Sequence, residues 1–213
     1  MRRSPALLLA LASGCFSPYV LPSVGFDQTA AMLPPHGAEV AVGGGYQLAT
    51  SASAGGQRSG AELPEGSALG SFALGHAGDL LVGVGEDTGE VAFKLRLPVG
   101  AFDLALQPEA GLSSGWRWQS NQPQLQGQGG TLGGGLDLLA SGPIAPGLAL
   151  YGGLRALGLV SAAGGLVAGA GLGVEWKVGP VLLRPELAVS QLFGLDGSTQ
   201  FIAYPHLVLA VRP

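Results

Sequence analysis

The sequence predicts an all-β fold, an antiparallel up-and-down barrel of about ten strands, with eight or twelve strands as the alternatives. Three observations predict it. Apolar and polar residues alternate with a period of two in successive short segments, charges gather on one side of those segments, and only 11% of the 213 residues are charged while 38 are glycine. Roughly a quarter of the residues of a soluble domain are charged, so this composition favours strands that cross a membrane.

The clearest alternation runs over residues 90–110. One face carries Val91, Phe93, Leu95, Leu97, Phe102, Leu104, Leu106, Pro108 and Ala110, and the other carries Glu90, Ala92, Lys94, Arg96, Asp103, Ala105, Gln107 and Glu109. A break at residues 98–100 separates the two halves, which predicts an antiparallel hairpin. In a soluble sandwich the apolar face would pack on a core, whereas in a membrane barrel it would face lipid and the charges would lie inside.

The N-terminus is typical of a bacterial export signal. Arg2 and Arg3 precede a short apolar run over residues 6–12. The ending LASGC at residues 11–15 resembles a lipoprotein signal, so we predict that residues 1–14 are removed and that Cys15 is lipidated; ordinary cleavage nearby is the alternative. Loss of the two arginines leaves eight basic and fourteen acidic residues. A net charge of −6 argues against nucleic acid as a partner.

The rest of the chain divides into a lead-in and a barrel domain. Residues 15–36 are Pro-rich without a clear period and are predicted to be a periplasmic lead-in to a barrel over residues 37–213. We predict strands over residues 38–48, 66–75, 79–86, 90–97, 102–118, 131–140, 148–160, 166–178, 181–193 and 200–212, with polar loops over residues 49–66 and 119–130. Connections after even-numbered strands are mostly short and those after the first, fifth and ninth are longer, as in outer-membrane barrels.

Carrying the alternation along the chain places nearly all strand charges on one face, predicted to point inward. The predicted lumen charge network is Glu39, Lys94, Arg96, Asp103, Glu109, Asp137, Arg155, Glu175, Arg184 and Glu186, with Gln107 on the same face. Because both signs are present, we expect mutual salt bridges and not an ion path of one sign. On the opposite face, Trp116 and Trp118 near one rim and Trp176 near the other are predicted to form an aromatic girdle. Strands in lipid must close into a barrel, since no water satisfies an open edge.

Three sequence features together resemble small bacterial outer-membrane β-barrel proteins of the opacity-protein and OmpX-like type. They are the stretch LRPEL at residues 183–187 within an alternating strand, the opening TAAMLPPHGAEVAVGGGY at residues 29–46, and the export signal. The resemblance covers about residues 38–212 and implies location in the outer membrane, contact with its lipid and insertion by the barrel-assembly machinery. The chain departs from this family at its end, which reads Val211-Arg212-Pro213 where the family usually has an aromatic residue.

Few residues suggest specific chemistry. His36, His76 and His206 are not spaced as metal ligands, so no metal or other cofactor is expected. Ser190, Glu186 and His206 share the inward face of neighbouring strands and could form a hydrolytic set, but we predict that they fill the lumen and that the protein is not an enzyme. The predicted function is a structural or narrow-pore outer-membrane barrel. The alternatives are a lipid-anchored soluble β-sandwich or lipocalin-like binder with its charged face outside, and a lipid-modifying barrel enzyme.

Overall fold

The structure is a computed structural model that describes residues 28–52, 58–75, 78–85, 88–97, 99, 102–113, 116–119, 122–125, 131–160 and 164–213. The predicted signal peptide, Cys15 and the first part of the predicted lead-in lie outside these ranges, as does His76. Within the described ranges, no helix is both long enough and apolar enough to cross a membrane.

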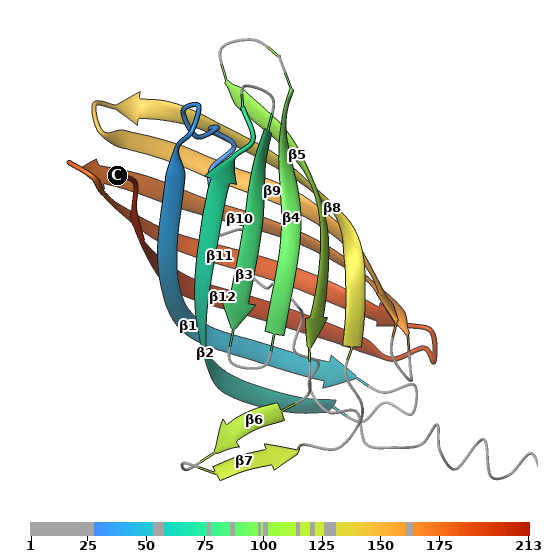
Figure 1. Ribbon diagram of the computed structural model, residues 1–213. Coiled ribbons are helices and arrows are strands. Elements are labelled where there is room, and N and C mark those ends of the chain that lie inside the picture. Colours follow the sequence, from blue (N-terminus) through green and yellow to red (C-terminus); the bar gives the residue numbers. More distant parts are fainter. Residues whose placement is uncertain are drawn as a thin grey trace, which may run out of the picture.

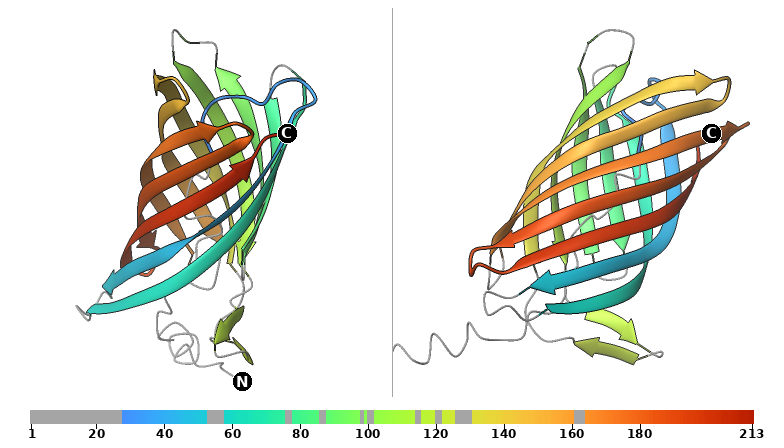
Figure 2. Two further views of the ribbon diagram at one scale, coloured as in Figure 1. Left: turned by 90° about the vertical axis from the view of Figure 1, so that its left-hand side faces the viewer. Right: turned by 180° about the vertical axis from the view of Figure 1, so that it is seen from behind.

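Ten strands close into one antiparallel barrel (Figures 1 and 2). They are β1 Ala38–Ala52, β2 Arg58–Ala73, β3 Gly78–Gly85, β4 Thr88–Leu97, β5 Asp103–Ser113, β8 Thr131–Ala145, β9 Leu148–Val160, β10 Gly165–Val178, β11 Val181–Gly194 and β12 Thr199–Val211. Neighbours along the chain pair with each other, and β12 pairs with β1 to close the sheet. The predicted up-and-down barrel and its strand number are confirmed.

The two ends of the barrel differ. At the terminal end, where β1 begins and β12 ends, tight turns at residues 146–147 and 179–180 join neighbouring strands. Gly179 in one of these turns has a φ of 63°, a left-handed conformation that glycine adopts without strain. The opposite end, called the loop end below, carries the connection between β5 and β8 (Figure 1).

That connection contains a separate two-stranded sheet, in which β6 Trp116–Gln119 pairs with β7 Gln122–Leu125. The predicted continuation of the fifth strand to Trp118 was therefore wrong, and neither Trp116 nor Trp118 belongs to the barrel wall of the predicted girdle. The even spacing of the tryptophans continued the parity of β5, but β5 pairs with β8 only as far as Ser113, opposite Thr131.

The polar loop predicted over residues 49–66 was also wrong in extent. β1 continues to Ala52 and β2 begins at Arg58, so most of this stretch is a long hairpin with a continuous register from Ala38↔Phe72 to Ala52↔Arg58. Small and polar residues give little contrast in hydropathy between the two faces. Residues 58–66 of β2 are held in a strand by backbone pairing with β1, and residues 49–52 of β1 pair with β12 as well.

The barrel wall has an apolar outer face and a largely polar inner face. Leu154 on β9 is 61% exposed while the next residue, Arg155, is 4% exposed. The same alternation gives outward-facing side chains that include Val42, Phe93, Leu112, Leu138, Leu172, Leu187 and Leu207. A water-soluble barrel would bury its apolar face inside, so this distribution is the one that lipid requires.

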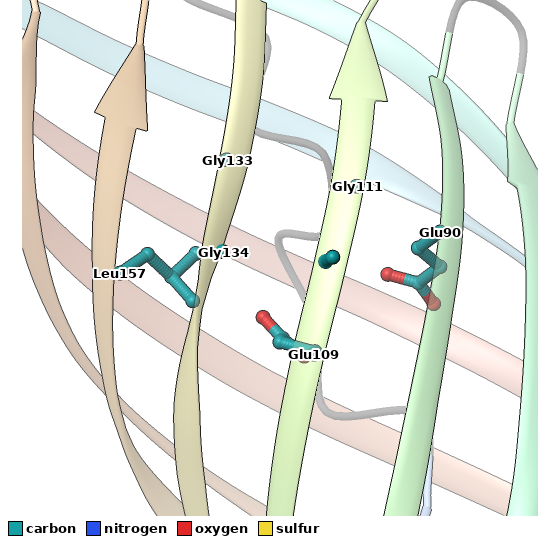
Figure 3. Close-up of a pocket in the computed structure, with 7 residues that line it drawn as sticks. Glu90, Glu109, Gly111, Gly133, Gly134 and Leu157 are labelled. Carbon is teal, nitrogen blue, oxygen red and sulfur yellow. The ribbon is translucent and has the colours of Figure 1, made fainter.

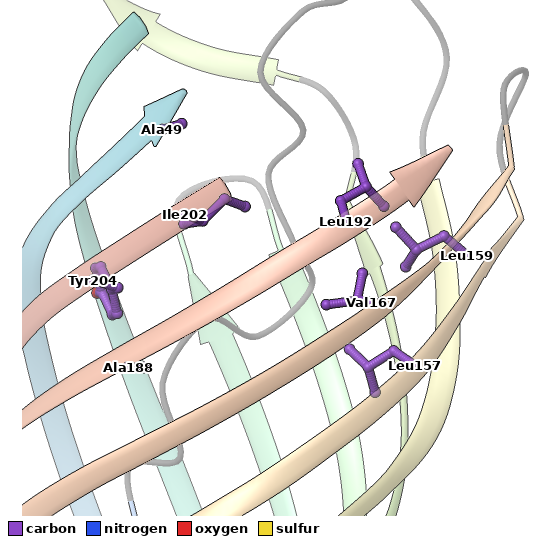
Figure 4. Close-up of a cluster of buried hydrophobic side chains, with 8 residues drawn as sticks. All are labelled: Ala49, Leu157, Leu159, Val167, Ala188, Leu192, Ile202 and Tyr204. Carbon is purple, nitrogen blue, oxygen red and sulfur yellow. The ribbon is translucent and has the colours of Figure 1, made fainter. Parts of the chain in front are cut away.

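The lumen also contains apolar side chains, which the sequence analysis did not predict. One cluster lies on β1 and β9–β12 at the loop end and comprises Ala49, Leu157, Leu159, Val167, Ala188, Leu192, Ile202 and Tyr204 (Figure 4). A second cluster joins β1–β4 to β11 and β12 and includes Leu69, Leu81, Leu182 and Val208. The interior therefore contains apolar clusters as well as charged groups.

Candidate functional site

The first group of lumen charges, the seam cluster, joins the first and last strands at the terminal end. Arg184 on β11 donates to both carboxylate oxygens of Glu39 on β1, at 2.7 and 2.9 Å, and its Nε donates to Glu175 on β10 at 2.9 Å. Arg212, just beyond β12, donates to Glu39 at 2.7 Å. The planar guanidinium of Arg184 matches a carboxylate in two parallel hydrogen bonds, which is the strongest form of such a pair.

The second group, the wall cluster, spans β5, β8 and β9. Asp137 and Arg155 lie directly opposite each other in the register of β8 and β9. Arg155 donates to Asp137 at 2.9 and 2.6 Å and to Glu109 on β5 at 3.3 Å. All three side chains are almost fully buried, so the guanidinium compensates two carboxylates that would otherwise repel each other.

A small pocket adjoins the wall cluster (Figure 3). Glu90 on β4 and Glu109 on β5 line it from neighbouring strands, and the glycines Gly111, Gly133 and Gly134 leave the space between them. Leu157 closes the side toward β9. The pocket is a local gap beside the charges, bordered by residues of four neighbouring strands, β4, β5, β8 and β9.

The third group is the pair Asp79–Lys94 on β3 and β4. The two residues are opposite each other in the register, and Lys94 Nζ lies 3.1 Å from Asp79 Oδ2. Both side chains are at most 4% exposed. A buried ammonium needs more than one partner to offset the loss of its hydration. Lys94 finds the others in a segment that comes before the barrel wall in the sequence.

Residues 28–33, called the plug segment below, lie inside the barrel at the terminal end. Lys94 Nζ donates to the carbonyl oxygens of Ala31 at 2.8 Å and Thr29 at 3.3 Å, and to Gln28 Oε1 at 3.3 Å. Ala30 packs in an apolar cluster with Ala105 of β5 and Leu139 of β8. These residues were predicted to form part of a lead-in before the barrel, and their lack of any period gave no sign that they enter it.

The structure brings most of the predicted charge network together. Glu39, Lys94, Glu109, Asp137, Arg155, Glu175 and Arg184 all form buried or largely buried ion pairs. Gln107 and Glu186 are buried on the inner face as predicted. Arg96 and Asp103 are the exception: they lie 3.7 Å apart with side chains 58% and 40% exposed, so they form a pair at the rim and not part of the lumen network. β4 ends at Leu97 and β5 begins at Asp103, so both residues lie at the strand ends, where solvent reaches them.

Two members of the network were missed. Asp79 lies near the start of β3 and Arg212 just beyond the end of β12, and both face inward. The parity rule could have found them, because Asp79 shares the face of Leu81 and Arg212 shares the face of His206. Trp176 is 54% exposed on the outer wall next to the turn at residues 179–180, the position predicted for a girdle residue.

The structure does not assemble the imagined hydrolytic set. Glu186 and His206 are opposite each other on β11 and β12, and the His206 ring stacks on Tyr204 with a centroid distance of 4.6 Å. Ser190, however, lies opposite Ile202. His206 is four residue steps along β12 from Ile202, about 13 Å at ~3.3 Å per residue, which is too far for a hydrogen bond from Ser190. Among the described residues, no group of three or more His, Cys, Asp or Glu could hold a metal ion.

Fold and lumen together define the class. A closed barrel with an even number of antiparallel strands, an apolar outer face and a charged interior is a transmembrane β-barrel of the outer-membrane type.

The chain is similar to several solved structures but matches no known family. No protein-family model matches the chain, and no curated protein matches it. Among solved structures, the chain is similar to the attachment invasion locus protein Ail of Yersinia pestis, with 10% identity over 82% of this chain and 99% of that one and a TM-score of 0.36. It is also similar to an outer membrane channel from Pseudomonas putida F1, with 12% identity over 85% of this chain and 97% of that one and a TM-score of 0.46. A third similar structure is the translocator domain of the autotransporter NalP from Neisseria meningitidis, with 9% identity over 82% of this chain and 88% of that one and a TM-score of 0.43.

Proposed function

We propose that this protein is an integral β-barrel of the bacterial outer membrane with a structural role, and that its lumen is closed to solutes at rest. The observation that carries the proposal is the filled lumen. The seam cluster, the wall cluster and the Asp79–Lys94 pair each bridge two or more strands, and the plug segment is bound to the Asp79–Lys94 pair at the terminal end.

The signs of the charges support closure. The seam cluster contains two arginines and two glutamates, and Asp79 and Lys94 balance each other. Side chains that satisfy one another at hydrogen-bonding distance leave little reason for a mobile ion to enter. A conducting filter presents a ring of one sign or a set of unpaired carbonyls instead.

The soluble-binder alternative is not favoured. A lipid-anchored lipocalin-like domain would turn its charged face to water and its apolar face inward. Here the strands have the reverse arrangement, with Leu154 outside and Arg155 inside. We also propose that the protein is not an enzyme, because the register keeps Ser190 away from His206.

The outer membrane as location is supported by the apolar outer wall and by the predicted export signal. Contact with outer-membrane lipid and insertion by the barrel-assembly machinery are part of the proposal. Lipidation of Cys15 would add a second attachment to the same membrane.

The test is to express the full chain in a Gram-negative host, fractionate the envelope, and compare boiled and unboiled samples by electrophoresis in detergent. We expect an outer-membrane band whose mobility shifts on boiling, because a closed barrel resists detergent until heated. The purified protein in a planar lipid bilayer should then show no steady conductance in potassium chloride. Release by carbonate washing would contradict the barrel in the membrane, and a steady wild-type conductance would contradict the closed lumen.

A further inference from the structure

The plug segment is held mainly by hydrogen bonds between its backbone and the Asp79–Lys94 pair of the wall. The Lys94 ammonium takes the carbonyl oxygens of Thr29 and Ala31, while Asp79 Oδ2 accepts the backbone N–H of Leu33 at 3.1 Å. Gln28 adds a side-chain hydrogen bond to Ser71 on β2. One ion pair of the wall thus contacts both the donors and the acceptors of the segment, and charged partners make these hydrogen bonds stronger than neutral ones.

The wall is complete without the plug segment. Each barrel strand pairs with two neighbours, including β1 with β12, and residues 28–33 contribute no strand to the sheet. If the segment left the lumen, Lys94 and Asp79 would still have each other as partners, and water could take the place of the backbone groups. Withdrawal therefore breaks a few hydrogen bonds and leaves the barrel ladder intact.

The end of the segment nearest β1 is fixed to the wall by backbone hydrogen bonds. A tight turn at residues 34–37 leads into β1, with the Gly37 N–H donating to the Pro34 carbonyl at 2.7 Å and the Gly37 carbonyl accepting from Ala73 of β2 at 3.0 Å. His36 in this turn has a φ of 62°, a left-handed conformation that is uncommon for a residue with a side chain. The turn directs the preceding residues back into the barrel.

We propose that the protein is a gated pore for small ions, in which residues 28–33 are a releasable plug and Lys94 is the latch that holds it. The inference rests on the proposed closed outer-membrane barrel and adds an open state to it. The crevice between plug and wall is bordered by Glu39, Ser71, Lys94, Arg184 and Arg212. Release would expose side chains of both signs there, so the open state conducts small ions with weak charge selectivity.

The experiment uses the full chain in planar lipid bilayers with potassium chloride. Lys94→Met removes the ammonium, and the matched control Lys177→Met removes an exposed lysine at the terminal end of β10. Since hydrogen bonds to charged groups are among the strongest in proteins, we expect Lys94→Met to raise the open fraction by roughly tenfold or more. Wild type and Lys177→Met should stay closed.

A second variant disturbs the plug and not the wall. Ala30 is 1% exposed among Ala105 and Leu139, so Ala30→Arg cannot seat in that cluster and should also open the pore. A lock tests whether the segment itself moves: in a Cys15→Ser, Lys94→Met background, Ala30→Cys and Leu139→Cys joined by a short thiol-reactive cross-linker should abolish the conductance. If the cross-linker is a cleavable one, its cleavage should restore the conductance.

The outcomes separate the two proposals. As a control, a mobility shift on boiling must first show that each variant still folds into a barrel. If the mobility of Lys94→Met and Ala30→Arg shifts on boiling but neither variant conducts, the gated pore is wrong, while the proposed barrel with a closed lumen is unaffected. If they conduct and the lock has no effect, the path does not run past the plug and the inference is equally overturned. Steady conductance of wild type would instead contradict the closed lumen itself.

Discussion

Arg184 on β11 reaches across β12 to bind Glu39 on β1 through two hydrogen bonds, although 145 residues separate them in the sequence. The contact lies inside the barrel at the seam where the first and last strands meet. Arg212 reinforces it from the end of the chain. The closing strands are thus joined by side chains as well as by backbone pairing.

Removing both partners of this pair should lower the free energy of unfolding by less than the sum of the two single removals. Arg184→Met leaves Glu39 buried with Arg212 as its remaining ion-pair partner, and loss of one member of a buried pair typically costs about 3–5 kcal/mol. The double variant Glu39→Gln, Arg184→Met removes the uncompensated charge. We expect it to lose less free energy of unfolding in urea than the sum of the two single variants. Strictly additive losses would contradict this coupling.

Removing Arg155, the single cation of the wall cluster, should also cause a large loss in the free energy of unfolding. Arg155→Met leaves Asp137 and Glu109 as neighbouring buried carboxylates, so we expect a loss in the upper part of the same range of about 3–5 kcal/mol. The control is Arg96→Met in the exposed rim pair, for which a change within about 0.5 kcal/mol is expected. Equal losses for the two variants would show that burial does not govern the effect.

Alternation of side chains made the wall predictable. A charge within a strand fixes which face is inside, so Asp137, Arg155 and Arg184 could be assigned to the lumen from parity alone, and their pairing followed from having both signs on one face. The same rule failed at Trp118, because parity gives no sign of where a strand ends. Arg96 failed for a related reason, since parity gives the face of a residue but not its distance from the rim.

The plug segment could not be predicted from any periodic pattern. Its residues have neither strand nor helix spacing, and its contacts with Lys94 are made largely by backbone carbonyls, which every residue type provides. The signal was indirect: Lys94 is a buried lysine with a single acidic partner in its own register. An ammonium with three protons to satisfy implied further acceptors from elsewhere in the chain.

A charged substitution on the lipid-facing wall should destabilise the barrel more at the middle of the membrane than near its surface. Leu154 lies midway along β9 on the outer face, so Leu154→Arg should destabilise the barrel by roughly 2–4 kcal/mol in lipid vesicles. Ile144 is similarly exposed but lies beside the turn at residues 146–147, and Ile144→Arg should cost roughly 0–1 kcal/mol there. Equal costs at the two positions, measured by urea unfolding, would contradict the membrane orientation.

Asp196 in the turn between β11 and β12 should give a small pH dependence outside the membrane. Hydrogen bonds from the Ser198 side chain and the Ser198 backbone N–H, the latter at 2.9 Å, hold the pKa of this carboxyl below its ordinary value. A lowered folded-state pKa contributes stability at neutral pH that is lost as pH falls through that pKa. Asp196→Asn should therefore match wild type in strong acid and be slightly less stable at pH 6, as urea midpoints would show. A constant difference at all pH values would assign the effect to shape and not to charge.

Gly173 on β10 provides the space that Tyr151 of β9 occupies in the lumen. The two residues are opposite each other in the register, and a Cβ at Gly173 would lie 2.6 Å from the Tyr151 hydroxyl and 2.8 Å from its Cε1. Tyr151 is almost fully buried, so its ring cannot move into solvent. Gly173→Ala should then cost about 1–3 kcal/mol through overpacking, measured as a lower urea midpoint.

Two further variants identify the cause of that loss. Gly89→Ala, on β4, meets no atom within 4 Å and should be nearly neutral, which controls for the general effect of adding a methyl group to a strand glycine. Tyr151→Ala removes the clashing ring, so Gly173→Ala should cost much less in that background than in wild type. If the penalty of Gly173→Ala were unchanged when Tyr151 is absent, the ring would not be its origin, and the requirement for glycine would have to lie in the backbone of β10.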